Sequence, residues 1–305
     1  MKILVGYDDS ECSKAALTDL ENAGLPSNVE LLVLMVTENW TMILERAANG
    51  DAVEEEFEYP GPEAITRIRE RNHAAFAETE NLVKGVAALL QSQYPRWKVQ
   101  SEALPGFAHW GILDRAREWN PDLIVVGSHG RSLIGRLALG SSSLKILTEA
   151  RCPVRIGRIT PARTWNDKSP QRIVIGMDGS PDSIVAVGSV ARRSWRPDSA
   201  VRLVTAIEPV LVATAGFEVD ITRMQEASEE AAQKLKSVGL HVSSTTKVGE
   251  AKDVLLKEAE IWGADAIFIG AKGHSFMERV LLGSVSYAVA SRANCSVEIV
   301  REATE

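Results

Sequence analysis

The two halves of this 305-residue chain repeat each other, and this repeat limits the fold more than any other feature of the sequence. The segment Ile3–Ser10 (ILVGYDDS) returns 170 residues later as Ile173–Ser180 (IVIGMDGS). The segment Ile124–Gly130 (IVVGSHG) returns as Ile267–Gly273 (IFIGAKG), but with an offset of 143 residues. Each half is long enough to bury a core of its own, so the repeat predicts two similar domains.

The change of offset locates an insertion. The difference between the two offsets means that the first half carries 27 extra residues between Glu38 and Gly106, and we place them in the acidic, proline-bearing stretch 40–69. The polar segment Arg158–Pro170 contains two prolines and no apolar periodicity, which is typical of a linker. We therefore expect a first domain over 1–157 with an insertion near 40–69, a linker over 158–170 and a second domain over 171–305.

Each half alternates short apolar runs with helical stretches. For the first half we expect strands over Lys2–Gly6, Leu31–Val36, Val99–Ala103, Leu123–Gly127 and Val154–Ile156, and helices over Ser13–Ala23, Glu63–Tyr94, Trp110–Trp119 and Ser142–Ala150. Nearly continuous apolar strands are typical of a parallel sheet that is covered on both faces. The fold class predicted for each half is α/β, an open parallel sheet with helices on both faces.

Composition excludes several functions. The net charge of -7 disfavours a general nucleic-acid binder. No apolar run approaches the roughly 20 residues of a membrane span, and the first residues lack the apolar core of a signal peptide. The three cysteines, Cys12, Cys152 and Cys295, form no Cys-x-x-Cys pair, so we predict neither a disulfide framework nor a cysteine-rich zinc site. We expect a cytoplasmic protein with no membrane partner.

Polar signatures follow the first and fourth strands of each half, where ligands bind in sheets of this kind. An aspartate follows the first strand, and a Gly-x2-Gly pair follows the fourth, with Gly-Ser nine residues later at a helix start. Glycines at such a turn let an anion approach the backbone, and a helix N-terminus offers N–H groups to phosphate oxygens. The aspartate is an acceptor suited to an adenine amino group or a ribose hydroxyl. Phosphates at one end and a base or sugar at the other describe a nucleotide.

The Gly-x2-Gly-x9-Gly-Ser spacing, present twice, together with Val-Gly-x-Asp-x-Ser after the first strand, resembles the universal stress protein family in its tandem-domain form. The resemblance covers residues 1–157 and 171–301 and implies two five-stranded parallel sheets in the order 3-2-1-4-5 and the binding of ATP, with magnesium. It implies a first site with adenine near Asp8 and Val36 and phosphates at Gly127, Gly130, Gly140, Ser141 and Ser142. The matching positions of the second site are Asp178, Ala206, Gly270, Gly273, Gly283, Ser284 and Val285.

The sequence departs from the pattern at three places. Ala206 stands where the first half has Val36, which removes apolar contact to the base but leaves a backbone hydrogen bond available. Glu278 places a negative charge near the expected phosphates of the second site. The extra residues of the first half would either cover the first site as a lid or block it.

Structural interpretations compete with these assignments. The glycines also fit chain geometry alone, the serines at the helix starts also fit N-caps, and Asp8 and Asp178 also fit turn residues. Ser10 and Ser180 fit caps better than ligand groups, and His129 and His274 lack a partner at a metal or triad spacing. Cys152 and Cys295 fit small buried thiols. The sequence contains no motif that activates water or a nucleophile, so we assign no catalytic or metal-binding residue.

The expected function is that of a cytoplasmic ATP-binding stress or regulatory protein that holds its nucleotide. Its two domains would form an intramolecular pseudo-dimer, with a homodimer of chains as a further arrangement. One alternative is an enzyme, a slow ATP phosphohydrolase or nucleotidyl transferase. Another is a nucleotide-free interaction platform that pairs through the last strands, Val154–Ile156 and Val297–Val300. We expect these two edges to meet, either within one chain or between two.

Overall fold

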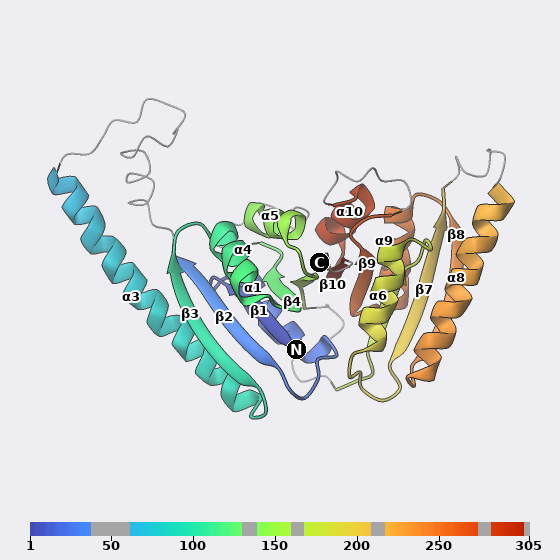
Figure 1. Ribbon diagram of the computed structural model, residues 1–305, viewed down its shortest axis with the longest axis horizontal. Helices are drawn as coiled ribbons and strands as arrows, with labels where there is room; N and C mark the ends of the chain where they lie inside the picture. The colour runs from blue at the N-terminus through green and yellow to red at the C-terminus, as the bar shows by residue number, and fades with distance from the viewer. Residues whose placement is uncertain (38–61, 130–138, 160–167, 209–216, 274–281, 302–305) are drawn as a thin grey trace.

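The structure, a computed structural model, describes residues 1–37, 62–129, 139–159, 168–208, 217–273 and 282–301 (Figure 1). The first half consists of β1 (Lys2–Tyr7), α1 (Glu11–Asp19), the short 3-10 helix η1 (Leu20–Asn22), β2 (Glu30–Thr37), α3 (Pro62–Gln93), β3 (Lys98–Pro105), α4 (Ala108–Trp119), β4 (Leu123–Gly127), α5 (Ser141–Glu149) and β5 (Val154–Gly157). The second half consists of β6 (Arg172–Gly176), α6 (Pro181–Ala191), β7 (Ala200–Ile207), α8 (Phe217–Ser237), β8 (His241–Val248), α9 (Ala251–Trp262), β9 (Ala266–Gly270), α10 (Ser284–Arg292) and β10 (Ser296–Val300).

All ten strands form one sheet in the order β3-β2-β1-β4-β5-β10-β9-β6-β7-β8. Within each half the strands are parallel, and their order is the expected 3-2-1-4-5. The two sheets are not separate, because β5 pairs antiparallel with β10, with Arg155 opposite Glu298. The two last strands therefore meet within the chain.

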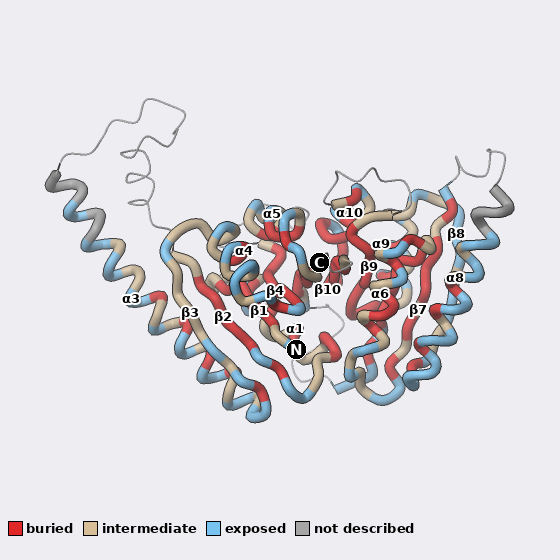
Figure 2. The backbone as a smooth tube through the Cα atoms, in the orientation of Figure 1, coloured by how far each residue is buried: buried red, intermediate tan, exposed pale blue. Residues whose placement is uncertain are grey.

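Helices cover both faces of the sheet (Figure 1). Helices α4, α5, α9 and α10 share one apolar core that runs across both halves. On the other face, α1 and α3 pack in a separate core of the first half, and α8 packs with α6 in that of the second. Figure 2 shows the buried strands inside and the exposed outer faces of α3 and α8. The continuous core and the continuous sheet join the halves into one unit.

The helix before the third strand differs most between the halves. Helix α3 has 32 residues, whereas its counterpart α8 has 21. Part of the insertion predicted near 40–69 is therefore extra helix, and its portion over 40–61 lies outside the described residues. Of the predicted linker, the structure describes only 158–159 and 168–170.

The seam between β5 and β10 contains buried charges. The Arg155 guanidinium donates to both carboxylate oxygens of Asp19, at 2.6 and 3.0 Å, and lies 3.4 Å from Glu298. Glu298 also accepts from Arg193. Arg155 and Glu298 have no exposed surface, so these four side chains form a closed network of two positive and two negative charges. Burial of this kind is tolerated only because every charge is paired.

Two further arginines cross the seam in equivalent ways. Arg158, after β5, donates to the carbonyl oxygens of Ala290 and Cys295 in the second half. Arg301, after β10, donates to the equivalent carbonyl oxygens of Leu147 and Cys152 in the first half. Each arginine thus donates to carbonyl groups at or just beyond the C-terminal end of the other half's last helix. A cation is favoured at this end of a helix.

Candidate functional site

The turn after β1 is built around Asp8. The Oδ1 atom of Asp8 accepts from the Ser10 amide at 3.1 Å and from the Ser10 hydroxyl at 2.6 Å. Ser10 is the N-cap of α1, and its Oγ accepts from the Ser13 amide at 3.1 Å. Between them, Asp9 has a φ of 62°, a left-handed conformation that Asp tolerates better than most residues. Ser10 is confirmed as a cap, and one oxygen of Asp8 has the turn role that the sequence left open.

The second half repeats this turn. The Asp178 Oδ1 atom accepts from the Ser180 amide at 2.9 Å, and Ser180 caps α6. Gly179 takes the left-handed conformation with a φ of 77°. A Cβ added to Gly273 would lie 2.8 Å from Oδ2 of Asp178, so the second oxygen of this carboxylate faces the glycine loop. The structure therefore brings Asp178 and Gly273 together, as the site prediction requires.

The first glycine of each pair has a packing role. A Cβ on Gly127 would lie 2.7 Å from the backbone carbon of Cys12 in α1, and one on Gly270 would lie 2.6 Å from Cβ of Asp182 in α6. Real Cβ atoms do not come that close, so each glycine lets the end of a strand touch a helix. Chain geometry thus explains these two glycines without a ligand. Gly130, the second glycine of the first pair, lies outside the described residues.

Helices α5 and α10 begin beside these strand ends. Their N-caps, Gly140 and Gly283, donate their amides to the carbonyls of Ser128 and Ala271, each at 2.8 Å. A glycine cap has no side chain to accept from the amides of the first helical turn, unlike the serine caps of α1 and α6. The sequence alternative that the helix-start serines are N-caps is therefore wrong, because Ser141 and Ser284 are the first helical residues. Ser142 and Val285 follow them within the first turn.

The predicted base position involves the ends of β2 and β7. At the start of β2 the Glu30 amide donates to the Met1 carbonyl, so even-numbered residues of β2 bond toward β1. The last paired residue of β1 is Tyr7, and the carbonyl of Val36 is directed past it, toward the turn at Asp8. In the second half the Met177 amide bonds to the Val204 carbonyl, which gives Ala206 the same orientation. The backbone acceptor is thus preserved although the side chain differs.

The Val36 side chain packs against a helix of its own half. A Cβ on Gly111 of α4 would lie 2.9 Å from Cγ2 of Val36. In the second half, the residue at the position of Gly111 is Val254, opposite the strand position that carries Ala206. A large strand residue facing a small helix residue has been exchanged for the reverse. The change from Val36 to Ala206 is therefore explained by packing, whatever contact it makes with a base.

Serines absent from the site prediction bond to the ends of the fourth strands. Ser143 Oγ donates to the Gly127 carbonyl at 2.8 Å, and Ser286 Oγ donates to the Gly270 carbonyl at 2.7 Å. The two serines are related by the same 143-residue offset as the glycines, and that repetition was the signal that sequence reasoning overlooked. Both hydroxyls fix the end of the fourth strand to the start of the following helix.

His129 lies at the rim of the first site. Its Nδ1 lies 3.2 Å from Ser128 Oγ, and its carbonyl is 3.4 Å from Ser10 Oγ. Burial and the nearby Arg158 lower the pKa of His129 below its ordinary value, so its neutral form is favoured. Its Nε2 atom is buried and has no hydrogen-bond partner among the described residues. His274 and Glu278 lie outside those residues.

The two cysteines predicted to be small buried thiols have raised pKa values. Burial raises the pKa of Cys152 to about 11 and that of Cys295 to about 12, which agrees with unreactive thiols. Within the described part of the chain, no three His, Cys, Asp or Glu side chains are grouped so as to hold a metal ion. The same residues contain no helix that is both long and apolar enough to cross a bilayer.

Comparison with known proteins identifies the family. The model of the Universal stress protein family matches the chain twice, over residues 1–158 and 170–301. The chain belongs to this family. It is a tandem universal stress protein, with one copy of the family's domain in each half.

Among curated relatives, a universal stress protein of Mycolicibacterium smegmatis is 29% identical over 62% of this chain and 64% of its own. One of Mycobacterium tuberculosis is 28% identical over 59% of this chain and 62% of its own. The matched regions thus span slightly under two thirds of these relatives. A solved universal stress protein from Archaeoglobus fulgidus, 18% identical, covers 98% of both chains with a TM-score of 0.66. A putative universal stress protein from Pseudomonas aeruginosa, 15% identical, covers 99% of this chain and 93% of that one with a TM-score of 0.61. These two solved structures share the fold.

Proposed function

We propose that this chain is a stress-response protein that binds ATP, with magnesium, at the carboxyl ends of the first and fourth strands of one or both halves. One observation carries the proposal. Helices α5 and α10 begin with glycine caps beside a strand end, whereas the adjacent α1 and α6 have serine caps of their own. First-turn amides without a side-chain acceptor at their cap suit a phosphate group. A cytoplasmic location and pairing between two chains stay predictions.

The residues present fit an adenine nucleotide. The amides and hydroxyls of Ser141 and Ser142 would hold phosphate oxygens in the first half, and Ser284 and Val285 offer the matching amides in the second. The Val36 and Ala206 carbonyls are acceptors for an adenine amino group, as the second carboxylate oxygen of Asp178 is for the amino group or for a ribose hydroxyl. Magnesium would supply charge neutralisation at the phosphates.

These groups bind and orient, and we assign none of them to catalysis. The polar groups at each site are backbone amides, hydroxyls, carbonyls and a carboxylate that already accepts a turn hydrogen bond. The neutral state favoured at His129 is compatible with a proton acceptor, but its only side-chain partner among the described residues is Ser128. The role proposed is therefore to hold the nucleotide. The platform alternative would pair through β5 and β10. These two strands are paired with each other, so their edges are not open to a second chain.

Calorimetry with ATP and magnesium tests the proposal. We expect Gly273→Glu to abolish binding in the second half, because its carboxylate would enter the space beside Asp178. Gly130→Glu should do the same in the first half. The control is Gly85→Glu, since an added Cβ at Gly85 in α3 meets no atom within 4 Å. Absence of ATP binding to the wild-type chain, or equal loss in the control, contradicts the proposal.

Aspartate variants should weaken ATP binding without abolishing it. Asp178→Ala or Asp8→Ala should weaken binding by ~1–3 kcal/mol, or roughly tenfold to a hundredfold, because a hydrogen bond to a charged acceptor is lost. Product chromatography after incubation with ATP separates holding from hydrolysis. Turnover that disappears in Gly130→Glu and Gly273→Glu would favour the enzyme alternative.

A further inference from the structure

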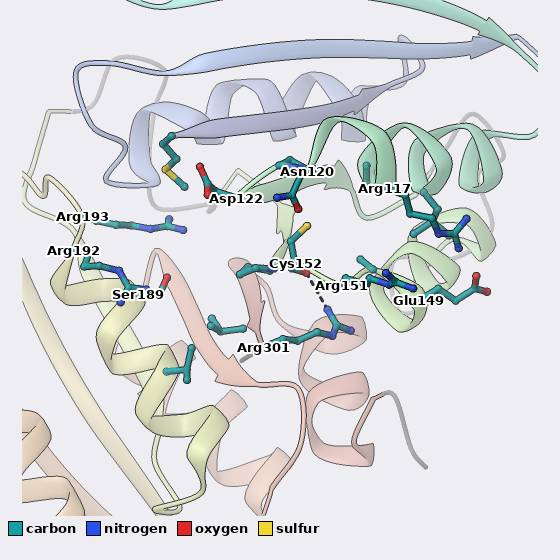
Figure 3. A pocket seen from close by; sticks show the side chains of 18 of the residues that line it. Arg117, Asn120, Asp122, Glu149, Arg151, Cys152, Ser189, Arg192, Arg193 and Arg301 are labelled. Atoms are coloured by element: carbon teal, nitrogen blue, oxygen red, sulfur yellow. Dashed lines mark hydrogen bonds between the residues drawn. The ribbon is translucent and has the colours of Figure 1, made fainter. Parts of the chain in front are cut away.

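A cavity of about 610 Å³ opens at the seam (Figure 3). Its walls come from both halves. Residues at the ends of α4 and α5 and before β4 and β5 form one side, and the end of α6 with the residues after β10 forms the other. Apolar surface is contributed by Ala116 and Val185, one from each half. The volume lies within the range of cavities that accept small organic ligands.

The cavity is rich in arginine although the chain is acidic. Its lining includes five arginines but only two carboxylates, those of Asp122 and Glu149. Arg193 is paired with Glu298 inside the seam, and Arg117 is paired with Asp114 on the surface. The other three are Arg151, Arg192 and Arg301. In the described part of the chain, none of these three has a carboxylate within 4.0 Å. Asp182 interacts with Arg301 without forming an ion pair with it. Within the described residues, the three guanidinium groups therefore have no ion-pair partner.

Arg301 is the most informative of the three. It is mostly buried, and burial lowers its pKa, which means that its charge lacks the stabilisation that water would give. Its guanidinium donates to the carbonyl oxygens of Leu147 and Cys152. Those two bonds use only two of its five N–H donors. Figure 3 shows Arg301 and Cys152 between Arg192 and Arg193 on one side and Arg117, Arg151 and Glu149 on the other.

The pseudo-symmetry of the chain provides an internal comparison. The positions equivalent to Arg117, Arg151 and Arg192 in the other half are Glu260, Asn294 and Asn22. The equivalent of Glu149 is Arg292. A repeated fold alone would have produced similar charges on both sides of the seam. The accumulation of cations on one side is therefore a property of this cavity and not of the repeated domain.

We propose that the seam cavity binds a small organic polyanion whose phosphate or carboxylate groups are held by arginines of both halves. Planar guanidinium groups match the two oxygens of either anion and can hold them through two hydrogen bonds at once. The apolar surface of Ala116 and Val185 would contact the carbon skeleton. Because Arg151 belongs to one half and Arg192 to the other, the bound anion bridges the seam and stabilises the joined form. None of the residues that line this cavity belongs to the residues of the proposed nucleotide sites.

Calorimetry at low ionic strength with pyrophosphate and with citrate tests the site and distinguishes the two anion chemistries. We expect at least one probe to bind with a stoichiometry of one, and Arg151→Gln and Arg192→Gln each to weaken it at least about tenfold. Both side chains are exposed at the cavity mouth, so neither change disturbs a buried pair. The control is Arg292→Gln, at the mirror position of Glu149, which should leave binding unchanged. A rise in the thermal midpoint with the probe that binds should disappear in the same two variants.

Three outcomes overturn the proposal. The first is that neither probe binds. The second is that Arg292→Gln weakens binding equally, which would mean general attraction to the surface. The third is that pyrophosphate binding is lost in Gly130→Glu or Gly273→Glu but kept in the arginine variants. The third outcome would place the anion at a nucleotide site, so it separates failure of this inference from failure of the proposed function. Binding that is retained in both glycine variants and weakened in both arginine variants supports the seam site.

Discussion

The two halves agree where they build the site and differ where they meet. Both have an aspartate turn, a serine-capped first helix and a glycine at the close contact between strand and helix. Both also have a serine whose hydroxyl donates to the carbonyl of the glycine that ends the fourth strand. At the centre of the seam, however, Arg155 in one half faces Glu298 in the other, although the two positions are equivalent in the repeat.

This difference explains why the halves pair with each other. If two copies of the first half met through β5, each Arg155 would keep Asp19 but would face a second Arg155 in place of Glu298. If two second halves met through β10, each Glu298 would keep Arg193 but would face a second Glu298 in place of Arg155. Only the mixed pair places opposite charges directly across the seam, so this contact favours it over pairing of like halves. A repeat can keep similar turns at the two strand ends, while the residues at the contact between the halves diverge.

The largest expected effect comes from breaking the seam. Arg155→Met would leave Asp19 and Glu298 buried without their shared cation, and should lower the free energy of unfolding by about 3–5 kcal/mol. Urea denaturation followed by circular dichroism measures the change. The matched control Lys84→Met removes an exposed pair with Glu80 and should cost less than about 0.5 kcal/mol. Equal effects from the two variants would contradict the role given to the network.

A smaller effect is expected at the repeated glycines. Gly127→Ala or Gly270→Ala forces a Cβ into helix α1 or α6 and should destabilise the fold by about 1–3 kcal/mol. By contrast, Gly85→Ala on the open surface of α3 should stabilise it by up to about 1 kcal/mol, since alanine favours a helix. Thermal unfolding of the three variants gives the sign of each change. A stable Gly127→Ala protein that has lost ATP binding would assign this glycine to the ligand instead of to packing.

A double-mutant cycle tests the exchange of large and small residues between the halves. Gly111→Val alone should clash with Val36, and Val36→Ala alone should leave a gap. Together they reproduce the arrangement of the second half, and we expect the pair to be more stable than the sum of the single changes by about 1 kcal/mol. Helix propensity cancels in the cycle, so an interaction energy near zero would mean that the two positions do not share one space. Urea midpoints supply the four values.

The smallest expected effect is a pH dependence that only the first half has at this position, because the residue equivalent to His129 is Lys272. The folded pKa of His129 is lowered, whereas the unfolded chain takes up this proton near the ordinary value of about 6.5. The stability contributed by neutral His129 is therefore complete above that pH and is lost as the pH falls toward the folded pKa. Thermal midpoints between pH 5 and 8 should fall less steeply for His129→Gln. An unchanged slope would contradict this.

Much of the fold could be predicted from the sequence, because it depends on periodic patterns. The strand Leu123–Gly127 was predicted with the ends that it has, and the strand order in each half is confirmed. The sequence does not decide whether the last strands meet within one chain or between two. The signal for this junction is the charge pair Arg155 and Glu298, and these positions are not neighbours in the sequence. The packing roles of Gly127 and Gly270 depend on how close two backbones come, which spacing does not encode. The cofactor-binding residues stay a prediction.

The reciprocal contacts of Arg158 and Arg301 have a consequence for synthesis. During translation, β5 emerges roughly 140 residues before β10, so at ordinary ribosome speeds the growing first half waits on the order of ten seconds with an open strand edge and with Arg155 lacking its contact to Glu298. The end of helix α5 likewise waits for Arg301, which follows the last strand. The nascent protein is therefore most vulnerable to aggregation through β5 during this interval, and its safety depends on how quickly the ribosome delivers the final strand.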